Sequence, residues 1–285
     1  MKITVLASGS KGNCTYYETP TAKVMVDCGI SYRQVRQRLA VNEIELIDLD
    51  ALFITHEHAD HVSGVSSLLA KQNANVYMSA KAYGKMHPNQ KSGIDVENLN
   101  FIEEVTMINN LRVTVIKTSH DSAEALGFIL EEDGIKVVHI TDTGYLPRSL
   151  FEQLEDADFY LMESNYEPEL LLESTRPFYL KQRILGNQGH LSNLQAALIL
   201  KELLTERTKG VIYLHLSGEC NSAFEAKLKH KEIIPNYDNY EMIYSFQHKP
   251  TKLIELVPVI KEVEVDVEME VEMEVEVENE EDETY

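Results

Sequence analysis

The chain has 285 residues, 44% of them hydrophobic and 26% charged, which is the composition of an ordinary globular protein with a buried core. No run approaches the roughly 18 consecutive apolar residues of a membrane-spanning helix, so we expect no membrane partner. The net charge is −21. Residues 261–285 contain 13 acidic residues and one lysine, and residues 1–260 contain 34 acidic residues and 25 lysines and arginines. More than half of the charge therefore lies near the C-terminus, and it says little about the substrate.

The first half of the chain alternates short apolar runs with turn signals. We predict a strand over residues 2–7, a hairpin within residues 16–29 and a polar helix over residues 31–39. The apolar run at residues 51–56 predicts a buried strand. The spacing of apolar residues over 61–71 predicts a helix after it.

The second half predicts more strands, interrupted by one strongly apolar helix. Five strands begin near residues 75, 111, 124, 135 and 159. The helix covers residues 193–204, and a last central strand covers residues 210–218. Two sheets packed on each other with helices outside satisfy this pattern, which predicts an α+β fold.

We predict one folded domain over residues 1–256 and an acidic low-complexity tail over residues 257–285, in which valine or methionine alternates with acids. The alternation favours an extended strand, but the charge opposes compaction, so we expect a disordered tail. The alternative is that the tail binds a partner protein or mimics nucleic acid.

Two features predict a cytoplasmic protein. The N-terminal apolar run is short and ends in serine and glycine, unlike a secretory signal. Cys14, Cys28 and Cys220 are odd in number and form no CxxC motif, so we expect free thiols in a reducing compartment.

The most informative segment reads His56-Glu57-His58-Ala59-Asp60-His61, directly after the predicted buried strand. Alternate residues of a tight loop point to one side, so His56 and His58 can share one ion while Asp60 and His61 reach a second. Imidazole and carboxylate ligands suit Zn²⁺ or Mn²⁺, with Fe²⁺ as a further candidate. A surface loop that is rich in histidine by chance is the alternative, and four ligands in six residues argue against it.

A site for two ions needs more ligands, and other predicted strands end in suitable residues. His120 and Asp142 each close an apolar run, and His215 lies near the end of the last strand. A buried histidine or acid with a structural role is the alternative for each alone. Their occurrence together with residues 56–61 favours one shared metal cleft.

These residues, with Asp27 after an early strand, resemble the metallo-β-lactamase superfamily. The resemblance implies an αββα sandwich and a hydrolase with two divalent ions. It implies seven ligands, namely His56, His58 and His120 on one ion, Asp60, His61 and His215 on the other, and Asp142 bridging both. Asp27 would brace the histidine loop and bind no ion.

Six further motifs narrow the resemblance to the WalJ/YycJ branch of this superfamily: SGSKGN (8–13), TSHD (118–121), TDTGY (141–145), MESNYE (162–167), GHLSN (189–193) and HLSGECN (215–221). DNA exonuclease activity is attributed to that branch, which implies nucleic acid as the substrate, DNA rather than RNA. The acidic tail and Gly218 depart from the expected pattern, and neither removes a ligand.

The resemblance also implies a mechanism. Two ions about 3.5–4 Å apart lower the pKa of a bridging water, so that hydroxide attacks at neutral pH. Asp60 can orient this nucleophile, and His190 is the candidate for the acid that protonates the leaving oxygen or for a phosphate contact. The alternative for His190 is a local role before the helix that starts near residue 193.

Competing functions use the same ligands. A hydrolase of a small thioester or lactone is the runner-up, and the overall acidity favours it. A di-iron centre that reduces oxygen would have glutamate at the position of His58, which argues against that function. A metal-holding protein without turnover would have lost some of the ligands, and none is missing. Residues 171–185 combine bases with Phe178 and Tyr179, which either stack on nucleotides or pack inward from an amphipathic helix. The oligomeric state stays open.

Overall fold

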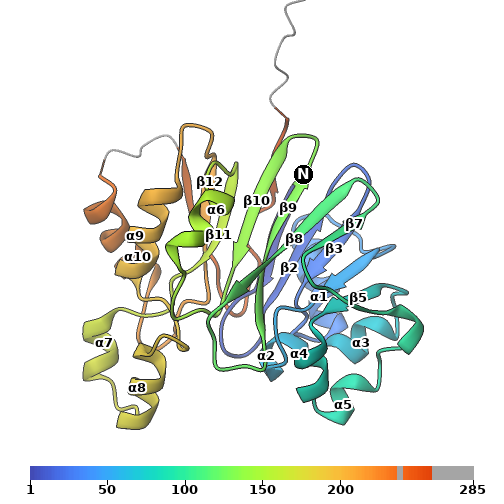
Figure 1. Ribbon diagram of the computed structural model, residues 1–285, viewed down its shortest axis with the longest axis horizontal. Coiled ribbons are helices and arrows are strands. Elements are labelled where there is room, and N and C mark those ends of the chain that lie inside the picture. The colour runs from blue at the N-terminus through green and yellow to red at the C-terminus, as the bar shows by residue number, and fades with distance from the viewer. Residues whose placement is uncertain (236–239, 259–285) are drawn as a thin grey trace, which may run out of the picture.

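Figure 1 shows the computed structural model as two stacked β-sheets with helices on both outer faces. The structure describes residues 1–235 and 240–258, so the acidic tail predicted over 257–285 lies outside the described residues from residue 259 onward. Each sheet contains seven strands. This arrangement is the αββα sandwich that was expected.

The first sheet starts with antiparallel strands and continues with parallel ones. Its strands are, in spatial order, β14 (Ile254–Glu255), β1 (Lys2–Ala7), β2 (Cys14–Glu18), β3 (Lys23–Val26), β4 (Ala51–Phe53), β5 (Asn75–Met78) and β6 (Leu99–Phe101). The pairs from β14 to β3 are antiparallel, and those from β3 to β6 are parallel. Parallel neighbours need crossover connections, which the helices of this half supply.

The second sheet repeats this plan. Its strands are, in spatial order, β13 (Glu241–Tyr244), β12 (Gly210–Leu214), β11 (Phe159–Glu163), β10 (Ile135–Ile140), β9 (Ala125–Glu132), β8 (Leu111–Thr118) and β7 (Val105–Ile108). The strands β7 to β10 form an antiparallel meander, and β10 to β13 are parallel.

The main core lies between the two sheets. Phe53 of β4 packs against Phe128 of β9 with ring centroids 5.5 Å apart, and both side chains are fully buried. Burial of each such side chain contributes roughly 1.5–3 kcal/mol. Further apolar clusters fill the space between each sheet and its helices, so the strand ends are fixed in position.

Short helices cover the first sheet: α1 (Tyr32–Val41), α2 (Ala59–Val62), α3 (Val65–Leu69), α4 (Ala80–Lys85), α5 (Pro88–Lys91) and the 3-10 turn η1 (Val96–Asn98). Ser31 caps the N-terminus of α1, and it forms a reciprocal capping box with Gln34.

The helix expected over residues 61–71 is divided into α2 and α3. Gly64 lies between them, and its N–H donates a 2.8 Å hydrogen bond to the carbonyl of Cys28. A β-carbon at Gly64 would lie 1.8 Å from the carbonyl oxygen of Ile30. The segment after β3 therefore lies too close to Gly64 for any other residue to fit there. This contact interrupts the helix.

The second sheet is covered by η2 (Arg148–Leu150), α6 (Phe151–Leu154), α7 (Pro168–Glu173), α8 (Phe178–Leu185), α9 (Asn193–Leu203) and α10 (Ala223–Ile233). The helix α9 ends one residue before the expected end. In Figure 1, α7 and α8 project at the lower left, and Phe178 and Tyr179 are 76% and 74% exposed. The interpretation that these aromatic side chains pack inward is therefore wrong. Among the described residues, no helix has the length and apolar character to cross a membrane.

Candidate metal centre

Several strand ends meet at one edge of the sandwich and bring acids and histidines together: Asp27 after β3, residues 56–61 after β4, His120 after β8, Asp142 after β10, Glu163 at the end of β11 and His215 after β12. The chain turns sharply there, because Asp27, Asp142 and His215 have positive φ angles of 60°, 47° and 56°. Such angles are uncommon for residues with a side chain, and strained backbone concentrates at functional sites.

His56, His58 and His120 form the first ligand group. Nε2 of His56 lies 3.0 Å from Nδ1 of His58, and one ring nitrogen of each of the three lies within 4.8 Å of the others. Nδ1 of His120 donates a 3.0 Å hydrogen bond to the carbonyl of Gly189. Nε2 of His120 is therefore the nitrogen that can bind an ion.

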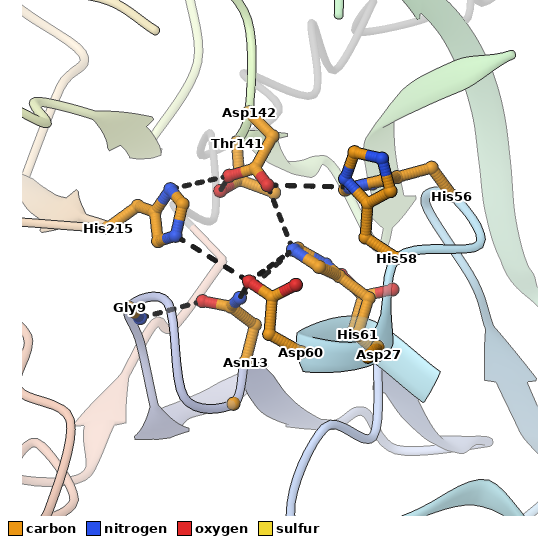
Figure 2. Close-up of polar contacts among 12 residues, drawn as sticks. Gly9, Asn13, Asp27, His56, His58, Asp60, His61, Thr141, Asp142 and His215 are labelled. Carbon is orange, nitrogen blue, oxygen red and sulfur yellow. Dashed lines mark hydrogen bonds and ion pairs between the residues drawn. The ribbon is translucent and has the colours of Figure 1, made fainter. Parts of the chain in front are cut away.

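We propose Asp60, His61 and His215 as the second group, while the ligand atoms of His56, His61 and Asp142 are also close enough to share an ion. Nε2 of His61 lies 3.5 Å from Oδ2 of Asp60, and Nε2 of His215 lies 3.8 Å from the same oxygen. Asp142 lies between the groups, with Oδ2 2.9 Å from Nε2 of His61 and 3.5 Å from Nε2 of His56. Figure 2 shows Asp142 between His215 and His56, which fits the bridging role that the resemblance implies.

Asp27 lies behind the histidine loop. Its Oδ2 accepts a 2.7 Å hydrogen bond from Nδ1 of His61, and its Oδ1 accepts a 2.8 Å bond from the N–H of Thr55. A carboxylate on one ring nitrogen fixes the ring and makes the other nitrogen a better ligand. Asp27 thus directs Nε2 of His61 into the cluster.

Glu163 is a member of the site that the sequence reasoning missed. Its buried carboxylate accepts hydrogen bonds from Nδ1 of His190 at 2.7 Å and from Nδ1 of His215 at 3.2 Å. The signal was an acid that closes the apolar strand FYLME, the same signal that singled out Asp142. His190 therefore joins the cluster, while Ser192 provides the cap of α9.

His215 allows two groupings of ligands. Its Nδ1 lies 2.6 Å from Asp142, and ligand atoms of Asp142, Glu163, His190 and His215 are close enough to share an ion. Its Nε2 is buried without a hydrogen-bond partner and lies on the side of Asp60. Ligand histidines usually donate their other N–H to a carboxylate, so we favour Nε2 as the ligand atom. An ion between this nitrogen and Asp60 would satisfy an otherwise costly buried group.

Burial and neighbouring charges perturb the protonation of the cluster. Burial lowers the pKa of His56 well below its ordinary value, and the charge of His61 lowers it further. Burial also acts to lower the pKa of His61, but Asp27 and Asp142 outweigh it and raise that pKa. Burial acts to raise the pKa of Asp142, but His215 and His61 hold it well below its usual value. Burial likewise acts to lower the pKa of His215, but Asp142 and Glu163 outweigh it and raise that pKa to about 10. Positive charge on His61 and His215 thus balances the buried carboxylates, and divalent cations fit the same role.

The loop of residues 8–13 supports the group of Asp60, His61 and His215. Nδ2 of Asn13 donates a 3.2 Å hydrogen bond to Oδ2 of Asp60, and the N–H of Asn13 donates to the Asp60 carbonyl at 2.7 Å. Oγ of Ser8 accepts a 2.7 Å bond from the N–H of His215. The loop therefore does more than connect the first two strands.

The remaining histidines have other partners. His139 is buried against the hydroxyl of Tyr17, and His230 is buried between two tyrosine hydroxyls. His87 caps α5, and His248 is exposed. Cys28 is buried in the core between the first sheet and its helices, as expected.

A family model described as a β-lactamase superfamily domain matches residues 22–215, more than half of the chain. The chain belongs to the metallo-β-lactamase superfamily. The exodeoxyribonuclease WalJ of Streptococcus pneumoniae is 35% identical over 223 residues, which cover 77% of this chain and 83% of that protein. The exodeoxyribonuclease YycJ of Bacillus anthracis is 30% identical over 235 residues, which cover 82% and 89%. These matches confirm the expected branch and its class, a metal-dependent hydrolase.

Solved structures confirm the fold. The metallo-β-lactamase fold protein YhfI of Bacillus subtilis aligns with a TM-score of 0.65 at 16% identity, over 87% of this chain and 98% of that one. Zn²⁺-bound PqqB of Methylobacterium extorquens aligns with a TM-score of 0.65 at 12% identity, over 90% and 100%. At such identities the likeness concerns the fold alone.

Proposed function

We propose that this chain is an exodeoxyribonuclease that holds two divalent ions, Zn²⁺ or Mn²⁺, in the cluster described above. The observation that carries the proposal is the cluster itself. The ligand atoms of His56, His58 and His120 are close enough to share one ion, and so are those of His56, His61 and Asp142. Asp60 lies 3.5 Å from His61 and 3.8 Å from His215. DNA as the substrate is argued from similarity, since both relatives matched over most of their length are named exodeoxyribonucleases. The buried free thiols support a cytoplasmic location.

When bound, the two ions would lower the pKa of a water molecule and balance the charge that develops on the phosphoryl group. The side chain of Asp60 is 21% exposed, whereas that of Asp142 is 3% exposed, so Asp60 can also accept a hydrogen bond from the attacking water. Orientation of the nucleophile is therefore its role.

His190 acts on the leaving side. Glu163 holds Nδ1 of this histidine, which leaves Nε2 to donate a proton to the leaving oxygen or to bind a phosphate oxygen. The side chain of His190 is 17% exposed, so a substrate can reach the ring, while Glu163 is fully covered.

The proposal is tested with metal-loaded protein on end-labelled single- and double-stranded DNA, RNA, bis-p-nitrophenyl phosphate and a thioester. We expect progressive shortening of DNA from an end and slow hydrolysis of the small diester. Turnover of the thioester alone would overturn the proposal and favour a small-molecule hydrolase.

A further inference from the structure

A cavity of about 500 Å³ adjoins the metal centre, and the proposed mechanism does not use it. Its walls come from three distant segments, namely residues 9–11, 216–223 and 245–249. The first segment leads to Asn13 and the second follows His215, both of which contact Asp60. Figure 2 shows Gly9 and Asn13 below His215 and beside Asp60. The walls of this cavity are therefore continuous with residues that contact Asp60.

The lining of the cavity is basic, although the chain is acidic. Among the described residues, Lys11, His248 and Lys249 line it and no aspartate or glutamate does. The whole chain has 47 acidic residues against 26 lysines and arginines. Over residues 1–235 and 240–258, neither lysine has an ion-pair partner. Both ammonium groups can therefore attract an anionic ligand.

One wall of the cavity carries an aromatic ring. The side chain of Phe246 is 40% exposed, and Nζ of Lys249 lies 4.1 Å from the centroid of its ring. The ammonium group lies over one face of the ring. A base can stack on the opposite face while the cation attracts the phosphate. The volume also falls within the range of small-ligand sites, roughly 300–1,000 Å³.

This wall is held in place by hydrogen bonds. Oε1 of Gln247 accepts a 2.7 Å bond from the N–H of Lys11, and Nε2 of Gln247 donates a 2.9 Å bond to the carbonyl of Gly12. The N–H of Ser8 donates a 3.2 Å bond to the carbonyl of Phe246. A wall that is already formed needs little ordering when a ligand binds.

We propose that this cavity binds the terminal nucleotide of the DNA strand, with its base on the Phe246 ring and its phosphate between Lys11 and Lys249. The inference rests on the proposed function, because it names the subsite that a DNA end would fill. Stacking accepts any base, so this subsite recognises a nucleotide without reading sequence.

The test measures binding of dAMP and of inorganic phosphate to the metal-loaded full chain by calorimetry. We expect dAMP to bind more tightly than phosphate. The variants Phe246→Leu and Lys249→Gln should each weaken dAMP binding by about tenfold and leave the metal content unchanged. Lys91→Gln is the matched control, because Nζ of Lys91 lies 4.7 Å from the Tyr83 ring centroid, a similar contact formed by residues that do not line the cavity.

On end-labelled oligonucleotides, both cavity variants should raise KM by a similar factor and leave kcat within about twofold. Unchanged dAMP affinity in both variants would overturn the inference, and so would equal affinity for dAMP and phosphate in the wild type. Wild-type protein that binds dAMP but never shortens DNA would instead overturn the proposed function. Lys249 is exposed, so its variant tests the cavity even where Phe246→Leu disturbs folding.

Discussion

At the scale of single residues, the carboxylates of the site have two kinds of task. Asp27 and Glu163 are buried and hold histidine rings by one nitrogen, so that the other nitrogen faces the cluster. Asp60 is partly exposed, and we propose that it orients the attacking water. Substitutions of these two kinds should therefore have different effects.

Asp60→Asn removes the charge and keeps the size of the side chain. We expect turnover of DNA to fall by ~10²–10⁴-fold, because the attacking water loses its negatively charged acceptor, while the fold stays intact. The measurement is kcat on labelled DNA, with circular dichroism as the check of folding. Asp48→Asn, at an exposed position, is the control that should change nothing. Full activity of Asp60→Asn would refute the proposed site.

Glu163→Gln tests the positioning role of a buried acid. We expect metal affinity and turnover to fall by about 10–100-fold, because His190 and His215 lose the charge that orients them. Metal content after dialysis gives a readout that is separate from activity. Glu132→Gln is the matched control, since Glu132 is also buried but bonds Thr21 at the far end of β9. Equal metal retention in both variants would contradict the role of Glu163.

At the scale of elements, close backbone contacts decide where the short helices begin and end. Gly64 separates α2 from α3 because the chain after β3 leaves no room for a side chain. This contact also positions α2, which carries Asp60 and His61. The ligand loop is thus coupled to the packing of its own sheet.

A pair of glycine substitutions tests this coupling. Gly64→Ala should lower the free energy of unfolding by about 1–3 kcal/mol, because a β-carbon would meet the Ile30 carbonyl at 1.8 Å. Gly84→Ala, in α4 with nothing within 4 Å of the added carbon, should raise it by up to about 1 kcal/mol. Urea unfolding measures both. Equal effects of the two substitutions would contradict the role of Gly64.

The helix α10 contributes a pH dependence through His230. Burial lowers the pKa of His230 to about 4. Between pH 4 and about 6.5 the unfolded chain binds a proton that the folded chain does not, so stability falls as the pH decreases, by up to about 1.4 kcal/mol per pH unit. Above this window the group has no effect.

Urea unfolding of wild type and His230→Gln at pH 7 and pH 5 measures the effect. The variant should lose less stability between these two values. Some loss should remain, because burial also lowers the pKa of His139, to about 3. A variant with the full wild-type loss would show that His230 is not a source of the pH dependence.

At the scale of the whole molecule, the folded part and the acidic end of the chain should be separable. Removal of residues 261–285 takes away 13 acids and one lysine. All proposed ligands lie at or before His215, and the last described strand ends at Glu255. We therefore expect metal content and the unfolding midpoint to stay unchanged. Loss of metal in the truncated protein would show that the tail contributes to the fold.

The sequence predicted the long and central strands and missed the edges. Short apolar runs indicated β1, β4, β8, β9, β10, β11 and β12, which are largely buried. The edge strands β6, β7, β13 and β14 were missed, because short and partly exposed strands carry little apolar pattern. The sequence also left open whether the aromatic side chains of residues 171–185 pack inward, because the helices α7 and α8 are largely exposed.

The sequence by itself determined the proposed metal-binding loop, since His56, His58, Asp60 and His61 are neighbours in the chain and need only a strand end to point together. Only the tertiary structure decided that Glu163 holds His190 and His215, and that a basic cavity forms from three distant segments. The reason is physical. Local patterns report which face of a strand is buried, whereas contacts between remote residues depend on how the two sheets pack.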